Sequence, residues 1–202
     1  MGGRHVSDWV ADIVRIPWPT CVGLCKNLNS LIPNSGFAPG RITGINSPPD
    51  DFYVQEGDLA LSIPVLNLET EIVGVPMKND NWDITWLGTK AGYLYGSAYP
   101  TRSGNSVITG HVWNADGSEG IFLGLEKLKY GDQIIIKNFG SVYSYSVIDV
   151  KENVAPNEIS QLFRKGNLDY VTLFTCQHYN EANNAYDARI VVRAVLTSVT
   201  AP

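Results

Sequence analysis

Three side chains that could cooperate in acyl transfer lie in apolar, strand-like runs. Cys176 closes a run that begins at Thr172, His111 ends a second run, and Arg189 lies in a third. A thiolate can attack a carbonyl carbon, an imidazole can protonate a departing amine, and a guanidinium can stabilise charge on the carbonyl oxygen. These residue types predict cysteine-dependent acyl transfer if the fold brings the three runs together.

The order and spacing of these residues resemble the sortases, which join surface proteins to bacterial cell walls or to one another. Residues 172–176 read TLFTC and are similar to the TLxTC signature of the family. Residues 109–111 read TGH and are similar to its small residue-Gly-His element. Arg189 follows Cys176 by thirteen residues (189 − 176), which suits the catalytic arginine of the family. The resemblance covers roughly residues 57–200.

The resemblance implies a mechanism and a location. Cys176 would attack the Thr carbonyl of an LPxTG-like sorting signal, His111 would protonate the leaving amine, and Arg189 would stabilise the oxyanion. The resulting thioacyl-enzyme would pass its acyl group to an amine acceptor, either a cell-wall peptide or a pilin lysine. The expected partners are surface proteins with a C-terminal sorting signal, and the expected location is the extracytoplasmic bacterial cell surface. Whether the role is wall anchoring or pilus assembly stays open.

The resemblance also implies a groove for the signal. Segment 153–169 corresponds to the loop that contacts the apolar end of the signal, and Phe174 could equally belong to the core. The candidate substrate-binding residues are Thr109, Ile159, Leu162, Thr172 and Phe174.

The residues themselves leave alternatives for the site. Cys176 could be an ordinary buried thiol, because free cysteine is among the most buried residue types. His178 lies two residues beyond the cysteine and would share its strand face, so it competes with His111 as the base. Arg193 competes with Arg189. We prefer His111 and Arg189, and we expect Cys176 near solvent at a strand terminus, followed by a polar loop.

Two other function classes stay open. A cysteine protease or hydrolase of the same fold could use the same residues, although the papain order places Cys first and the caspase signature is missing. A non-catalytic cell-surface β-domain of the same ancestry is the other class. The net charge of −5 argues against a nucleic-acid partner.

No metal or cofactor is expected. Some sortases bind calcium through acidic residues ahead of the histidine, but residues 93–110 contain no Asp or Glu. Cys21 and Cys25 have no further ligand at metal spacing, so they are two ordinary thiols or one local disulfide. No apolar stretch is long enough for a transmembrane helix. Sortases usually carry a membrane anchor, so we expect a trimmed chain or another tether.

Short β-rich runs closed by Gly or Pro dominate residues 57–202. This pattern predicts an all-β domain with short helices, and the resemblance implies a closed eight-stranded barrel. The expected strands are 59–65, 71–75, 83–87 (an edge run), 105–112, 133–137, 142–147, 170–176 and 188–199. Helical or turn segments are expected at 122–130 and 155–165.

Residues 1–56 differ from the rest and are interpreted as an N-terminal extension. Repeated prolines break any long element, yet large apolar residues such as Trp18 and Phe37 favour docking over exposure. A segment of this kind cannot build its own core. We expect it to dock on the barrel face away from the groove, because no part of it resembles the sorting signal.

Overall fold

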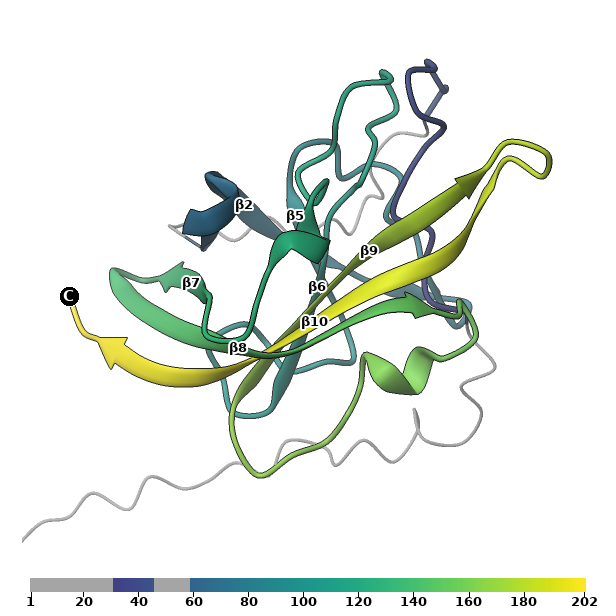
Figure 1. Ribbon diagram of the computed structural model, residues 1–202. Helices are drawn as coiled ribbons and strands as arrows, with labels where there is room; N and C mark the ends of the chain where they lie inside the picture. Colours follow the sequence, from purple (N-terminus) through teal and green to yellow (C-terminus); the bar gives the residue numbers. More distant parts are fainter. Residues whose placement is uncertain (1–30, 46–58) are drawn as a thin grey trace, which may run out of the picture.

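The structure is a computed structural model that describes residues 31–45 and 59–202 (Figure 1). The described part consists of strands and three single turns of 3-10 helix. The strands are β1 (Ala60–Ile63), β2 (Leu68–Val75), β3 (Met77–Lys78), β4 (Asn81–Trp82), β5 (Ala91–Leu94), β6 (Asn105–Thr109), β7 (Gln133–Asn138), β8 (Ser141–Val154), β9 (Tyr170–Asn180) and β10 (Ala185–Thr200). The 3-10 turns are η1 (Pro64–Leu66), η2 (Leu125–Lys127) and η3 (Ile159–Gln161).

Among the described residues, eight strands close a barrel in the order β1-β2-β5-β6-β9-β10-β8-β7. The pairs β2–β5 and β6–β9 are parallel, and the other pairs are antiparallel. The strands β8 to β10 are the long ones, and they cross one another as a twisted sheet in Figure 1. The prediction of an all-β fold with short helices and a closed eight-stranded barrel is confirmed.

The barrel has apolar residues on both faces of its central strands. Successive side chains of a strand point to opposite faces. Accordingly Leu173 belongs to the large cluster with Ile108, whereas the next residue, Phe174, belongs to a second cluster with Val107. The first cluster fills the barrel and the second lies under the loops that cover its outer face. A strand such as β9 therefore reads as a continuous apolar run, as strands buried on both faces do.

The strand β9 does not end at Cys176, as expected, but continues for four residues to Asn180. The polar residues after the cysteine pair with the start of β10, and the tight turn between the strands includes Asn184 with a φ of 52°. Asparagine tolerates this left-handed conformation. The predicted loop is therefore mostly a β-hairpin, and the cysteine lies inside a strand.

Two other expected elements are shorter than predicted. Segment 155–165 forms only the single turn η3, which is enough to bury Ile159 and Leu162 because these residues are three apart. Residues 83–87 are not a strand, and the short strand β4 lies just before them.

We predict that truncation of the barrel interior destabilises the protein strongly. Ile136 is fully buried in the large cluster, so Ile136→Ala should lower the free energy of unfolding by about 2–5 kcal/mol. Val199 is 51% exposed, and Val199→Ala should change this free energy by roughly 0.5 kcal/mol or less. Urea unfolding followed by tryptophan fluorescence measures both. Equal losses would contradict this description of the core.

Candidate active site

The register of the parallel pair β6–β9 brings His111 to the level of Cys176. Each residue of β6 pairs with the residue of β9 that follows it by 65 positions, as in Thr109↔Phe174. The Thr175 hydroxyl donates to the Gly110 carbonyl at 2.9 Å, which continues the contact beyond the end of β6. The 65-residue interval between His111 and Cys176 equals this register.

The antiparallel pair β9–β10 brings the arginine to the same place. Arg189 lies directly opposite Cys176 in the register. Its side chain is 4% exposed, and among the described residues its guanidinium donates only to backbone carbonyls. Two of these acceptors, Tyr186 and Ala188, belong to β10 itself, at 3.0 and 2.9 Å.

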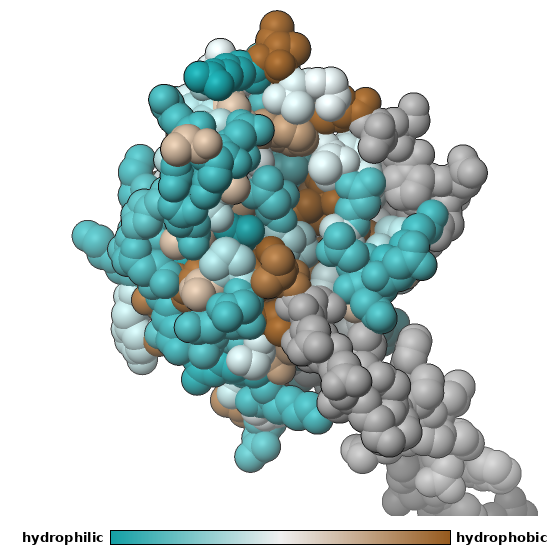
Figure 2. Space-filling model, turned by 90° about the vertical axis from the view of Figure 1, so that its right-hand side faces the viewer, coloured by the Kyte–Doolittle hydropathy of each residue, from teal (hydrophilic) through white to brown (hydrophobic). Residues whose placement is uncertain are grey.

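A peptide segment crosses the barrel over these residues. We call residues 31–45 the cover segment. Its backbone N–H groups donate to the Pro156, Trp113 and Ala115 carbonyls at 2.7, 3.1 and 2.7 Å. The segment runs beside β9 and β10 on the right in Figure 1. Figure 2 shows this side of the molecule as mostly hydrophilic, with hydrophobic residues in small patches.

The cover segment contacts the thiol directly. The Ser35 N–H donates to the Cys176 Sγ at 3.1 Å, and the thiol in turn donates to the Asn34 Oδ1 at 3.0 Å. Cys176 is completely buried. Burial raises the pKa of the Cys176 thiol, while Arg189 and the Ser35 hydrogen bonds act in the opposite direction. In this arrangement the sulfur is a protonated thiol.

His111 is also enclosed, with 1% of its surface exposed. Its ring lies 5.1 Å from the ring of Phe37, a residue of the cover segment. Neither ring nitrogen has a hydrogen-bond partner among the described residues. Burial lowers the pKa of His111, and the nearby backbone of Ser35, Thr85 and Ile84 opposes this effect. The imidazole is therefore neutral under the cover.

Two expectations about this site are wrong. Cys176 is not near solvent at a strand terminus, because β9 continues past it and the cover segment buries it. The described part of the extension does not lie on the far face, because it contacts Cys176 and Arg189. Residues 1–30 and 46–58 lie outside the described residues, and with them Cys21, Cys25 and Trp18.

The rival residues occupy other surroundings. His178 is exposed and has a φ of 59°. Arg193 lies opposite Thr172, four pairs from the cysteine, with its guanidinium carbon 3.9 Å from the centre of the Tyr170 ring. It also donates to the Arg164 carbonyl at 3.1 Å. These contacts describe a structural role for Arg193.

The five residues expected to bind substrate are all buried. Thr109 donates its hydroxyl to the Phe174 carbonyl at 3.1 Å, and Thr172 donates to Asn105 at 2.8 Å. Phe174, Ile159 and Leu162 belong to the outer apolar cluster. That cluster also contains a residue of the cover segment, Ile32. The two threonines thus connect neighbouring strands through hydrogen bonds. The three apolar residues instead lie in the cluster that contains Ile32 of the cover segment.

Sequence reasoning missed the contribution of Asn34 and Ser35 to the site. Neither residue type is a nucleophile or a base in this setting, so composition alone gave no reason to choose them. A Cβ on Gly110 would lie 2.7 Å from the Ile121 side chain. The backbone before His111 therefore approaches its neighbours closely.

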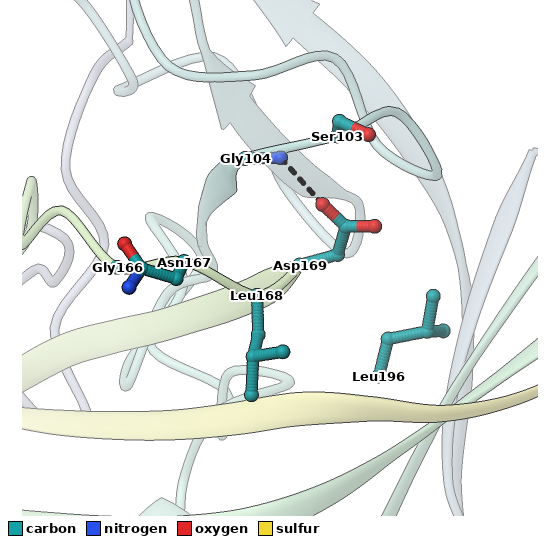
Figure 3. A pocket seen from close by; sticks show the side chains of 7 residues that line it. All are labelled: Ser103, Gly104, Gly166, Asn167, Leu168, Asp169 and Leu196. Atoms are coloured by element: carbon teal, nitrogen blue, oxygen red, sulfur yellow. Dashed lines mark hydrogen bonds between the residues drawn. The ribbon is translucent and has the colours of Figure 1, made fainter.

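A hollow lies at the opposite end of β6 and β9 (Figure 3). It has a volume of about 560 Å³, and polar residues line it together with the side chains of Leu168 and Leu196. The Asp169 carboxylate accepts a hydrogen bond from the Gly104 N–H at 2.8 Å. The hollow holds no thiol or imidazole. Within the described ranges, no group of three or more His, Cys, Asp or Glu side chains is arranged to hold a metal ion.

The model of the sortase domain matches residues 61–197. The chain belongs to the sortase family. This match includes all three proposed catalytic residues of the sortase barrel. Among curated proteins, no sequence matches the chain. No helix in the described residues is long and apolar enough to span a membrane.

Solved sortase structures share the fold. Sortase A from Corynebacterium diphtheriae is 31% identical over 71% of this chain and 62% of its own, with a TM-score of 0.57. A lid mutant of that enzyme is 30% identical over 72% and 73%, also at 0.57. Sortase C from Streptococcus pneumoniae is 28% identical over 74% and 73%, with a TM-score of 0.58.

We predict that displacement of the cover segment makes Cys176 more reactive. A Cβ on Gly36 would lie 2.6 Å from Val112 and 2.9 Å from Tyr186, so Gly36→Val should force the segment off. The exposed thiol would keep Arg189 beside it and lose its desolvation. The midpoint of its pH–alkylation profile should therefore move to lower pH, and the rate at neutral pH should rise at least tenfold, about one pKa unit.

The matched control is Gly44→Val, because a Cβ on Gly44 meets nothing within 4 Å. Iodoacetamide labelling read by mass spectrometry on the peptide that contains Cys176 separates this thiol from Cys21 and Cys25. An unchanged profile in Gly36→Val would show that the segment does not protect the thiol.

Proposed function

We propose that this sortase is a cysteine transpeptidase acting on an LPxTG-like sorting signal. The Cys176 thiolate attacks the Thr carbonyl, and the bond between Thr and Gly breaks. The leaving amine takes a proton from the protonated His111, and the acyl group stays on the sulfur as a thioester. An amine acceptor then attacks the thioester, gives a proton back to His111 and forms the new peptide bond, and the thiolate leaves.

One observation carries this proposal. The guanidinium of Arg189 stands opposite the thiol in the strand register and already donates to backbone carbonyls of a peptide, at Ile32 and Pro33. A side chain that binds peptide carbonyls beside a nucleophile is suited to orient a peptide substrate. The same donor can stabilise the negative charge that develops on a carbonyl during attack.

His111 must gain a proton before it can act as the general acid. Its pKa is lowered by burial under the cover segment, so the covered imidazole is neutral. Once the cover leaves, water reaches the ring, and the desolvation that lowered its pKa is relieved. The protonated imidazole can then supply the proton that the departing amine requires.

The proposed partners are surface proteins with a C-terminal sorting signal, together with an amine on a cell-wall peptide or pilin. The proposed location is the bacterial cell surface. Hydrolysis by the same residues is the nearest alternative, because water can also attack a thioester. A non-catalytic role is less favoured, because Cys176, His111 and Arg189 are all retained and meet at one place.

We predict that three substitutions separate catalytic from structural residues. In a Gly36→Val background, Cys176→Ala should abolish acyl transfer from an LPxTG peptide to an amine. His111→Ala and Arg189→Ala should each lower the rate by a factor on the order of 10² or more. The controls His178→Ala and Arg193→Ala should lower it much less. A fluorogenic peptide assay with product masses gives the ranking, and the reverse order would overturn the assignment.

We predict that calcium changes the rate little. The stretch 93–110 before His111 contains no carboxylate that could bind the ion. The same assay with added calcium, and then with chelator, provides the measurement. A large stimulation that chelator removes would contradict this prediction.

A further inference from the structure

The cover segment contains a sequence that matches the proposed sorting signal residue by residue. Residues 32–36 read Ile-Pro-Asn-Ser-Gly, and the proposed signal reads Leu-Pro-x-Thr-Gly. Ile replaces Leu as an aliphatic residue, and Ser replaces Thr as a hydroxyl residue. Our expectation that no part of residues 1–56 resembles the signal is therefore wrong.

The aliphatic end of the match lies in an apolar site. Ile32 is 1% exposed and shares a cluster with Ile159 and Leu162, the residues expected to contact the apolar end of the signal. Its N–H donates to the Pro156 carbonyl at 2.7 Å, just before η3. Burial of a whole aliphatic side chain is favourable by about 1.5–3 kcal/mol, so this end anchors the segment.

The hydroxyl residue of the match lies at the thiol. The Ser35 N–H donates to the Cys176 Sγ at 3.1 Å, and its carbonyl accepts from the Val112 N–H at 2.9 Å. Its hydroxyl also lies 3.5 Å from that of Thr175. The segment therefore places Ser35 at the nucleophile, where the proposed signal places its Thr.

The glycine of the match occupies a position with no space for a side chain. A Cβ on Gly36 would lie 2.6 Å from Val112 and 2.9 Å from Tyr186, and real Cβ atoms almost never approach so closely. Between the two ends, Arg189 donates to the Pro33 and Ile32 carbonyls at 3.2 and 3.3 Å. Direction, register and the need for glycine all agree with those of the proposed substrate.

We infer that residues 32–36 are an internal sorting-signal ligand that occupies the substrate groove of its own chain. The inference rests on the proposed function and extends it to specificity. The groove recognises an aliphatic residue, Pro, a third residue (here Asn34, whose Oδ1 accepts from the thiol), Ser or Thr, and Gly, in that order from Pro156 to Val112. The sulfur is a hydrogen-bond partner of the Ser35 N–H here, not an attacking group, so the segment is a ligand that is held rather than cut.

A tethered ligand is hard to displace. A ligand that is part of the same chain as its site has an effective concentration on the order of millimolar, so a free signal peptide must exceed this level or wait for the cover to open. We therefore expect a free signal peptide to bind a variant whose cover is displaced and not to bind the wild-type chain. This difference makes the inference testable with a peptide that copies the segment.

The experiment uses the full chain with Gly36→Val and the peptide acetyl-Leu-Ile-Pro-Asn-Ser-Gly-Phe, which copies residues 31–37. At millimolar concentration the peptide should slow iodoacetamide labelling of Cys176 at least fivefold. The same peptide with Val in place of Gly, and a shuffled peptide, should give no protection. The wild-type chain and Gly44→Val should label slowly with or without peptide. Ile32→Asp is the second opened variant, and thermal unfolding shows that each variant is folded.

A Leu-Pro-Asn-Thr-Gly peptide with an amine acceptor tests the proposed function in parallel. If the Leu-Pro-Asn-Thr-Gly peptide is transferred but the peptide that copies residues 31–37 does not protect the thiol of Gly36→Val, the inference is overturned and the proposed function stands. If the copied segment protects the thiol but no peptide is transferred, the occupancy stands and the transfer chemistry is refuted. Protection that is equal for the Gly and Val peptides would also overturn the inference.

Discussion

The site depends on the register of the parallel pair β6–β9, because it alone joins the imidazole to the thiol. A one-residue slip in a strand turns every side chain to the opposite face. Such a slip would carry Cys176 into the barrel and expose Thr175. The slip is opposed because Leu173 fills the barrel interior while Phe174 fills the outer cluster. The two apolar cores therefore fix the geometry of the proposed catalytic site as well as the stability.

The cover segment supplies hydrogen-bond acceptors to the guanidinium of Arg189, which is buried beside Cys176. A guanidinium that is 4% exposed needs acceptors for its N–H groups, since a buried donor without a partner costs about 1–3 kcal/mol. Strand β10 supplies two carbonyls to Arg189, and the cover supplies the two from Ile32 and Pro33. A substrate that displaces the cover must offer equivalent carbonyls. This requirement favours an extended peptide over a compact ligand.

The sequence predicted the parts of the protein that repeat a local pattern. The alternation of turns and β-rich runs indicated an all-β domain, and the spacing of His111, Cys176 and Arg189 matched registers that the barrel imposes. The end of β9 was missed because polar residues after Cys176 read as a loop, although they pair in a hairpin. The position of the cover was missed because it depends on contacts between residues more than 140 apart, such as Ser35 and Cys176. No local pattern reports such contacts.

The covered state buries polar atoms that have no hydrogen-bond partner, and this cost weakens the binding of the cover segment to the barrel. Both ring nitrogens of His111 are buried without a hydrogen-bond partner among the described residues, and the Phe37 ring lies against the imidazole. Each unpartnered polar group that is buried costs free energy, and water would remove that cost. Opening therefore regains solvation for His111 while it loses the anchor at Ile32 and the carbonyls at Arg189. The balance between these terms sets the fraction of chains in which the cover is open.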